Sequence, residues 1–156
     1  VAEELARDGI ELLSSVTFVP QLLAPKGCLT WRSPSQRETE DIEFGWPIAK
    51  EIAHRQIGQS VVVKEKVVLA VEAIEGTDEA LIRGGKLGRE GVVAIKVARE
   101  DMDLRFDIPT GGPETVKTLK DAGVSCLAIE AGKTLVLDKG EMIRLADKEG
   151  ISIIAL

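Results

Sequence analysis

The sequence predicts an α/β domain with a mixed sheet and helices on its faces. Apolar, β-branched runs of strand length recur along the chain, and stretches of helical period lie between them. Two of these runs flank the polar turn at 64–66, which is typical of an antiparallel hairpin, whereas later runs alternate with helices as in β-α-β units. Together, hairpins and β-α-β units give a sheet with both antiparallel and parallel neighbours.

The first 36 residues are predicted to precede this domain. Residues 1–9 have the spacing of a helix end, and residues 10–20 read as a strand that ends at a proline. Residues 20–36 contain three prolines and one glycine, which is typical of a linker or a wrapped loop. We therefore expect residues 1–20 to be the tail of a preceding domain, 21–36 a linker, and 37–156 the domain itself.

A long helix is expected after Ser35, which stands three residues before Glu38 as in a capping box, and Pro47 is expected to kink or split it. Residues 67–74 are almost continuously apolar, which predicts a strand covered on both faces. The other predicted elements follow in order: a short helix from 77, a strand at 91–98, a helix from Pro113 to Gly123, a second hairpin of strands 126–132 and 134–138, a helix at 138–150 and a strand at 151–156.

Composition excludes several classes of protein. The single histidine, His54, rules out a multi-histidine zinc site and reads as a solvated or capping residue. Two cysteines cannot build a four-thiolate site, and their low number fits a reducing compartment. A net charge of −6 and five aromatic residues do not favour nucleic-acid binding. Apolar runs such as Val67–Val71 are far shorter than the roughly 20 residues of a membrane span.

Polar residues at the ends of three predicted strands are candidate functional residues. Glu72 interrupts an apolar run, and a buried carboxylate needs a partner. Glu75 and Asp78 follow at the turn into the next helix. Two interpretations are open: a functional pair of carboxylates, or a plain helix start in which Gly76 makes the turn, Thr77 caps the helix and acidic residues favour its positive end.

The second strand end brings basic and acidic residues together. Lys96 lies inside a strong strand, where lysine is uncommon, and Arg105 follows in a loop with Asp101, Asp103 and Asp107. A solvated charge run is the alternative interpretation, but apolar residues at 106, 108 and 109 indicate that this loop is partly enclosed.

Glycine-containing turns follow the second and third strands. Thr110, Gly111 and Gly112 lead into a helix, and bare amides at a helix N-terminus suit a phosphate, although most such turns only cap. Glu130 ends the third strand and Gly132 turns the chain, for which a simple hairpin turn is the alternative.

Carboxylates beside Lys96 and Arg105 favour a hard cation next to a phosphate group. Mg²⁺ or Mn²⁺ prefers carboxylate oxygens, neutralises a diphosphate and helps to generate an attacking hydroxide. The two basic side chains would stabilise charge on the non-bridging oxygens. The glycine-rich stretch at 84–91 lacks the spacing of a P-loop, which excludes that class of nucleotide site.

At these residues the sequence resembles the LpxI-type UDP-2,3-diacylglucosamine diphosphatases. The stretches that carry the resemblance are IGQSVVVKEKVVLAVEAIEGTDEALIR, DLRFDIPTGGPETV and CLAIEAGKTLVLDK, preceded by LLAPKGCLTWRSPSQRETEDIEFGW. They resemble the C-terminal domain of the family, which implies that residues 1–20 are the tail of an N-terminal Rossmann-like domain. The stretch at 83–91 is shorter and more glycine-rich than the family pattern, which leaves acyl-chain contacts open.

The resemblance implies a divalent-metal-dependent hydrolase of lipid A synthesis that converts UDP-2,3-diacylglucosamine to UMP and lipid X (2,3-diacylglucosamine 1-phosphate). The essential aspartate of the family corresponds to Asp107, expected to hold Mg²⁺ (or Mn²⁺) or to orient the attacking water. Asp78, with Glu75, is expected to complete the metal shell. The substrate-binding residues that it implies are Thr77, Lys96, Arg105, Thr110, Gly111, Gly112, Glu130 and Gly132.

The expected partners are the lipid substrate, the family's N-terminal domain and the inner-membrane surface, met peripherally from the cytoplasm. A homodimer is left open, and no nucleic acid is expected. Two other functions fit the same residues: a non-catalytic lipid-holding or dimerisation domain, and a metal-dependent phosphohydrolase with another substrate.

Overall fold

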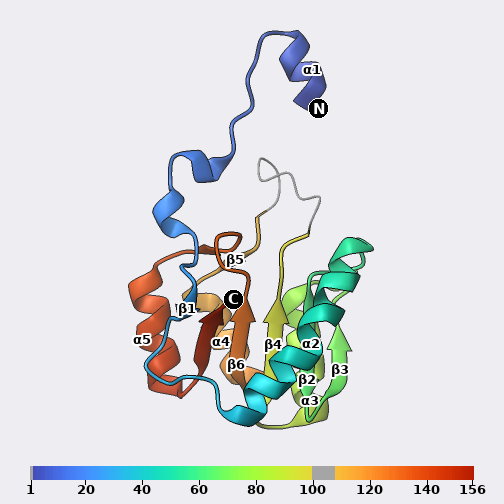
Figure 1. Ribbon diagram of the computed structural model, residues 1–156, viewed down its shortest axis with the longest axis vertical. Helices are drawn as coiled ribbons and strands as arrows, with labels where there is room; N and C mark the ends of the chain where they lie inside the picture. The colour runs from blue at the N-terminus through green and yellow to red at the C-terminus, as the bar shows by residue number, and fades with distance from the viewer. Residues whose placement is uncertain (1, 100–107) are drawn as a thin grey trace.

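A six-stranded mixed sheet forms the centre of the part of the chain that the computed structural model describes, residues 2–99 and 108–156 (Figure 1). The strand order is β1-β8-β6-β4-β2-β3, and β5 and β7 form a separate parallel pair. The strands are β1 (Gly27–Cys28), β2 (Ser60–Lys64), β3 (Val67–Val71), β4 (Val92–Lys96), β5 (Thr110–Gly111), β6 (Val124–Ile129), β7 (Leu135–Val136) and β8 (Ser152–Ala155).

Helices cover both faces of this sheet. Helix α2 (Gln36–His54) covers one face, and α3 (Thr77–Gly88), α4 (Pro113–Asp121) and α5 (Lys139–Glu149) cover the other, whereas α1 (Ala2–Arg7) lies apart from the sheet in Figure 1. Side chains alternate between the faces along each strand. Val61 and Val63 of β2 therefore pack with α2, whereas Val62 packs in the cluster that contains Leu81 of α3 and Leu119 of α4. The predicted α/β class with a mixed sheet is confirmed.

Strands β4, β6 and β8 are parallel neighbours, so their carboxyl ends meet at one edge of the sheet. Strand β2 runs antiparallel to both β3 and β4, and the predicted hairpin is confirmed. Its turn places Glu65 and Lys66 at positive φ angles of 52° and 59°. The buried Asp41 carboxylate accepts hydrogen bonds from both of their amides, at 3.0 and 2.6 Å, and so supports this turn from α2.

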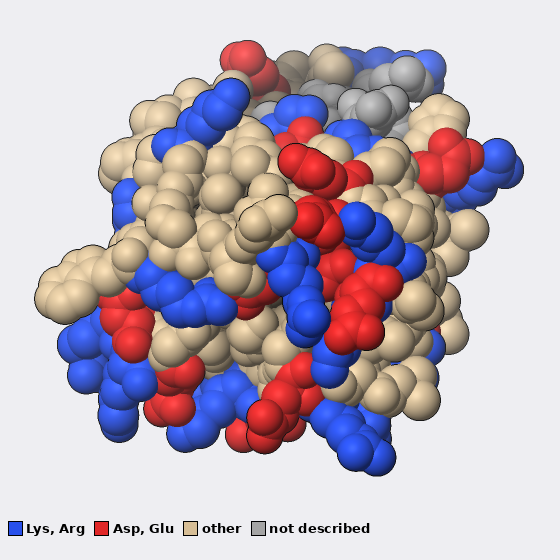
Figure 2. Space-filling model, turned by 60° about the horizontal axis from the view of Figure 1, so that its bottom comes forward, with Lys and Arg blue, Asp and Glu red and all other residues tan. Residues whose placement is uncertain are grey.

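The hairpin turn lies at the lower end of the sheet in Figure 1. Acidic and basic residues are interspersed on the face that Figure 2 shows. Ion pairs of Lys66 with Glu40 at 2.9 Å and of Arg37 with Glu65 at 3.5 Å link the turn to the first part of α2. All four side chains are largely exposed, so each pair contributes little to stability.

The structure differs from several predictions about local structure. Residues 10–20 contain short 3-10 turns at Ser15–Thr17 and Pro20–Leu22 in place of a strand, since an apolar run becomes a strand only beside a pairing partner. Strand β3 is the sheet edge and is covered only in part: Val67 is 56% exposed, whereas Leu69 packs in the cluster on one face and Val68 in the cluster on the other. Strands β6 and β7 do not form a hairpin, because β6 is already paired on both sides and β7 pairs with β5. Residues 27–28 of the expected linker form β1, paired with β8.

Helix α2 begins with the predicted capping box. Glu38 N donates to Ser35 Oγ at 3.3 Å, and Ser35 N donates to Glu38 Oε2 at 2.7 Å. The helix continues through Pro47 without a break, so the proline does not split it.

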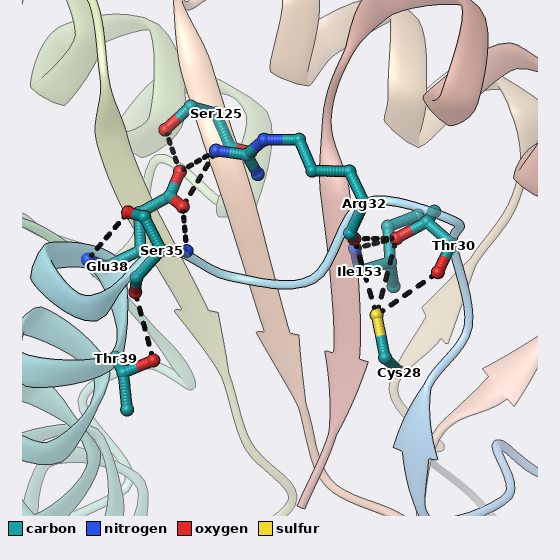
Figure 3. Close-up of polar contacts among 8 residues, drawn as sticks. All are labelled: Cys28, Thr30, Arg32, Ser35, Glu38, Thr39, Ser125 and Ile153. Atoms are coloured by element: carbon teal, nitrogen blue, oxygen red, sulfur yellow. Dashed lines mark hydrogen bonds and ion pairs between the residues drawn. The ribbon is translucent and has the colours of Figure 1, made fainter.

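The Glu38 carboxylate also ties α2 to the sheet (Figure 3). Arg32 donates to both of its oxygens at 2.6 and 2.7 Å, and Ser125 of β6 donates to it at 2.5 Å. Burial by itself raises the pKa of Glu38, but the hydrogen bonds from Arg32, Ser125 and Ser35 outweigh it and hold the pKa below its usual value. The contacts of Glu38 with Arg32, Ser35 and Ser125 are therefore explained by the packing of α2 against the sheet.

Helix α3 lies very close to its neighbours because its buried face carries three glycines. A Cβ atom on Gly84 would come 2.6 Å from a methyl group of Val62, and one on Gly88 would come 2.2 Å from a methyl group of Val92. On Gly85 it would come 1.9 Å from the backbone oxygen of Ala122, which follows α4. The helix can therefore sit against both the sheet and the end of α4.

We predict that Gly85→Ala lowers the free energy of unfolding by about 1–3 kcal/mol, because the added methyl group meets backbone that must move. Gly140→Ala is the matched control, since Gly140 is exposed at the start of α5 and an added Cβ there would have nothing within 4 Å. This change is expected to raise stability by up to about 1 kcal/mol. Urea unfolding of both variants measures the difference, and equal midpoints would contradict the explanation.

Candidate active site

A polar groove of about 390 Å³ lies where the N-termini of α3 and α4 approach the end of β4. Its lining consists of residues 75–79, Lys96, Thr110 and Thr115. The structure thus brings the first predicted strand end together with Lys96 and Thr110 of the second. Two helix N-termini present positive partial charge, and with the Lys96 ammonium they favour an anion.

Lys96 is the last residue of β4 and is half-buried. Its Nζ donates to the backbone oxygen of Thr110 at 3.4 Å. The neighbouring residues of the strand, Val93 to Ile95, are fully buried, so the lysine marks the point at which the sheet opens onto the groove. An ammonium at the end of a central strand can hold a phosphate oxygen without being buried itself.

The first turn of α3 supplies the acidic rim of the groove. Gly76 is the N-cap, with a φ of 85° that glycine accepts readily, so the expected cap at Thr77 was wrong. The Thr77 hydroxyl instead donates to the buried Glu72 carboxylate at 3.1 Å. Asp78 is exposed in the first turn and free of any recorded hydrogen bond or ion pair within the described residues.

The Glu75 carboxylate is already bound. It accepts from Arg83 at 2.5 Å and from the amide of Ala73 at 3.1 Å. Backbone amide donation, followed by Arg83, holds the pKa of Glu75 below its usual value. These contacts explain Glu75 as the partner of Arg83 and leave it less available as a metal ligand than Asp78.

The N-terminus of α4 follows β5. The amide of Gly112 donates to the Thr115 hydroxyl at 3.1 Å, and the carbonyl of Gly111 accepts from the amide of Leu137 at 2.8 Å. Neither glycine is among the described residues that line the groove. Their bonds position the turn, and the groove receives Thr110 and Thr115 instead.

Glu130 and Gly132 lie outside this groove. Glu130 is buried at the end of β6, where it pairs with Lys50 of α2 at 3.3 Å and Lys133 at 2.8 Å and accepts from the amide of Ala98 at 2.9 Å. The amide of Gly132 donates to the carbonyl of Ala24 at 2.9 Å. Burial raises the pKa of Glu130, but Lys133, the Ala98 amide and Lys50 together lower it below its usual value.

Two of the predicted residues, Arg105 and Asp107, lie outside the described residues, as do Asp101 and Asp103. Across residues 2–99 and 108–156, no group of three or more His, Cys, Asp or Glu residues could hold a metal ion. His54 is exposed at the end of α2, as expected for a solvated residue.

Sequence reasoning missed Thr115 and Glu79 of the groove. The signal for Thr115 was its position three residues after Gly112, which is the spacing of a capping contact. Glu79 was considered only for its charge near the helix start, because its place in the groove wall depends on how α3 packs.

Comparisons with known proteins show the family of this chain. The family model described as the LpxI C-terminal domain matches residues 25–154. The chain belongs to the LpxI C-terminal domain family. A relative from Caulobacter vibrioides, described as UDP-2,3-diacylglucosamine pyrophosphatase LpxI, is 34% identical over 165 aligned residues. The alignment covers the whole of this chain, whereas it covers only 59% of the length of the relative.

A solved structure similar to this LpxI-family chain is the dCMP deaminase of the cyanophage S-TIM5. It shares 12% sequence identity and a TM-score of 0.44, and the match covers 80% of this chain and 100% of the deaminase. Among the described residues of the LpxI-family chain, no helix has the length and apolar character needed to cross a membrane.

We predict that Glu130→Gln destabilises the chain at neutral pH by about 1–3 kcal/mol, since it removes a charge that two lysines and an amide hold. Because the pKa of Glu130 is lowered on folding, its contribution is present above the ordinary value of 4.5 and is lost as the pH falls through the lower, folded value. Thermal unfolding between pH 7 and pH 3 is therefore expected to show a difference from wild type that shrinks below about pH 4.5.

Glu114→Gln provides the control, because the Glu114 side chain is 83% exposed and pairs only with Lys117 among its recorded ion pairs in the described part of the chain. Its unfolding temperature should follow that of wild type across the same range. If the difference in unfolding temperature between Glu130→Gln and wild type does not change with pH, the ion pairs of Glu130 are not the cause of the destabilisation.

Proposed function

We propose that this chain is the C-terminal, catalytic part of a two-domain UDP-2,3-diacylglucosamine pyrophosphatase, preceded by a Rossmann-like domain of which residues 1–20 are the tail. The reaction is hydrolysis of the diphosphate to UMP and lipid X in lipid A synthesis. Membership of the LpxI family and the name of the 34% identical relative support the substrate class.

The observation that carries the proposal is the convergence of two helix N-termini and Lys96 on one polar groove. A diphosphate has several anionic oxygens, and the groove offers positive partial charges from α3 and α4 as well as the Lys96 ammonium. Thr110 and Thr115 line the same wall, where the Thr110 hydroxyl donates to the carbonyl of Ile108 at 3.0 Å and the Thr115 hydroxyl accepts from the amide of Gly112 at 3.1 Å. A pure scaffold has no need for this set of groups at one strand end.

Asp78 and Asp107 are the residues that would hold a divalent metal or orient the attacking water. Asp78 is exposed beside the groove, and Asp107 follows Lys96 along the chain at a family motif. Glu75 is the weaker ligand, since Arg83 and an amide already bind its carboxylate. When bound, Mg²⁺ or Mn²⁺ supplies charge neutralisation at the diphosphate and lowers the pKa of a bound water. Arg105 would add a further positive charge.

A second groove of about 500 Å³ is a candidate for the acyl chains. It is lined by Ile42, Glu43, Trp46, Pro47, Glu130 and Leu156, and its walls are mainly apolar. The same groove favours the alternative function, a non-catalytic lipid-holding domain. In either case we propose that the protein acts on its lipid at the cytoplasmic face of the inner membrane, peripherally.

We predict that Asp107→Ala and Asp78→Ala lower UMP release from UDP-2,3-diacylglucosamine in the two-domain protein by roughly 10²-fold or more. Release would be measured with Mg²⁺, with Mn²⁺ and after chelation, and circular dichroism would verify folding. Asp121→Ala is the matched control, because Asp121 is an exposed aspartate at the opposite end of α4.

Full activity of both variants would assign the chemistry to the other domain and favour the lipid-holding function. Activity without UMP as a product would favour a phosphohydrolase with another substrate.

A further inference from the structure

The buried Glu72 carboxylate is the end point of a hydrogen-bond chain that runs through Thr77, one of the residues that line the groove. Glu72 is 7% exposed and stands directly after β3. Its Oε2 accepts from the amide of Gln59 at 3.3 Å, and its Oε1 accepts from the Thr77 hydroxyl at 3.1 Å. No ion pair to Glu72 is recorded within residues 2–99 and 108–156, so neutral donors satisfy this carboxylate.

The direction of donation along these hydrogen bonds follows from the number of hydroxyl protons. Thr77 has one hydroxyl proton, and this proton is donated to Glu72. The Ser60 and Thr77 hydroxyl oxygens lie 3.4 Å apart, so Ser60 must be the donor in that contact. The order of donation is therefore Ser60 to Thr77 to Glu72.

This order leaves the Thr77 oxygen with one lone pair and no proton to offer. A threonine hydroxyl accepts up to two hydrogen bonds, and Ser60 uses one of these positions. Thr77 is one of the residues that line the groove, and no described residue donates to the remaining position. A ligand at this position must be a donor, and a fully ionised phosphate oxygen does not qualify.

We propose that Thr77 Oγ1 accepts a hydrogen bond from a water molecule in the groove, beside Asp78, and that Glu72 is the positioning residue that keeps Thr77 in this acceptor state. The inference rests on the proposed function, because it assigns this water to the hydrolysis. It revises the expectation that Thr77 binds the substrate directly.

Backbone contacts around Glu72 hold the residues of this hydrogen-bond chain close together. The amide of Glu72 donates to the carbonyl of Ser60 at 2.9 Å, and a Cβ atom on Gly58 would come 2.1 Å from the Glu72 carbonyl oxygen. The loop before β2 and the end of β3 are therefore in close contact. These contacts fix the backbone positions of Glu72 and Ser60, from which both side chains reach Thr77.

Crystal structures of the 156-residue chain with Thr77 unchanged and with Thr77→Val test the water site without any assay of activity. We expect a water about 2.6–3.2 Å from Thr77 Oγ1 in the first structure and no water there in the second. Thr77→Ser keeps the hydroxyl and is expected to retain the water. A wild-type structure that has no water on this oxygen would overturn the proposal.

Glu72→Gln tests the direction of the hydrogen bonds. Its amide oxygen is required by the Gln59 amide, so its NH₂ group would face Thr77 and donate to it. With Ser60 still donating, both lone pairs of the Thr77 oxygen would be occupied, its proton would turn towards the groove and the acceptor position would be lost. In the two-domain protein we expect Glu72→Gln and Thr77→Val each to lower kcat for UMP release about 10- to 100-fold with KM nearly unchanged.

The double variant should be no worse than the poorer single variant, and Thr77→Ser should remain close to wild type. A raised KM with unchanged kcat in Thr77→Val would mean that Thr77 contacts the phosphate, which overturns the inference but leaves the proposed function intact. A water on Thr77 in a protein that releases no UMP would support the site and refute the proposed function.

Discussion

The close approach of α3 to the sheet and to α4 is the constraint on which the candidate site depends. Three glycines on its buried face leave room for Val62, Val92 and the backbone of Ala122. A side chain at any of these positions would push the helix outwards. Because α3 lies so close, its N-terminus reaches the end of β4 beside the N-terminus of α4, and the two helix ends share one groove with Lys96.

The charged groups of the domain divide into two kinds with different surroundings. Glu38 and Glu130 are buried carboxylates with basic partners and amides around them, and they join α2 to the sheet. Asp78 and Lys96 stand at the groove, where solvent and a ligand can reach them. A buried ion pair adds specificity to the packing, whereas an acidic residue beside a lysine at two helix ends is suited to a bound, charged ligand.

Much of the site was predictable because its residues stand at the ends of recognisable elements. Glu75, Asp78, Lys96 and Thr110 were selected from strand ends and helix starts, and the structure brings them to one groove. Glu130 was selected by the same rule, but it is bound by Lys50 and Lys133 elsewhere. The rule cannot separate the two cases, since a carboxylate after a strand looks the same in sequence whether its partner is a ligand or a lysine 80 residues away.

The sequence by itself determined the α/β class, the β2–β3 hairpin, the capping box of α2 and the family, because these depend on local periodicity, capping spacings and motifs. Only the tertiary structure decided that β3 is an edge, that β7 pairs with β5 and that Thr77 donates to Glu72. The reason is physical. Strand order and hydrogen-bond direction are set by which distant segments satisfy each other's polar groups, and a local pattern of residues does not contain that information.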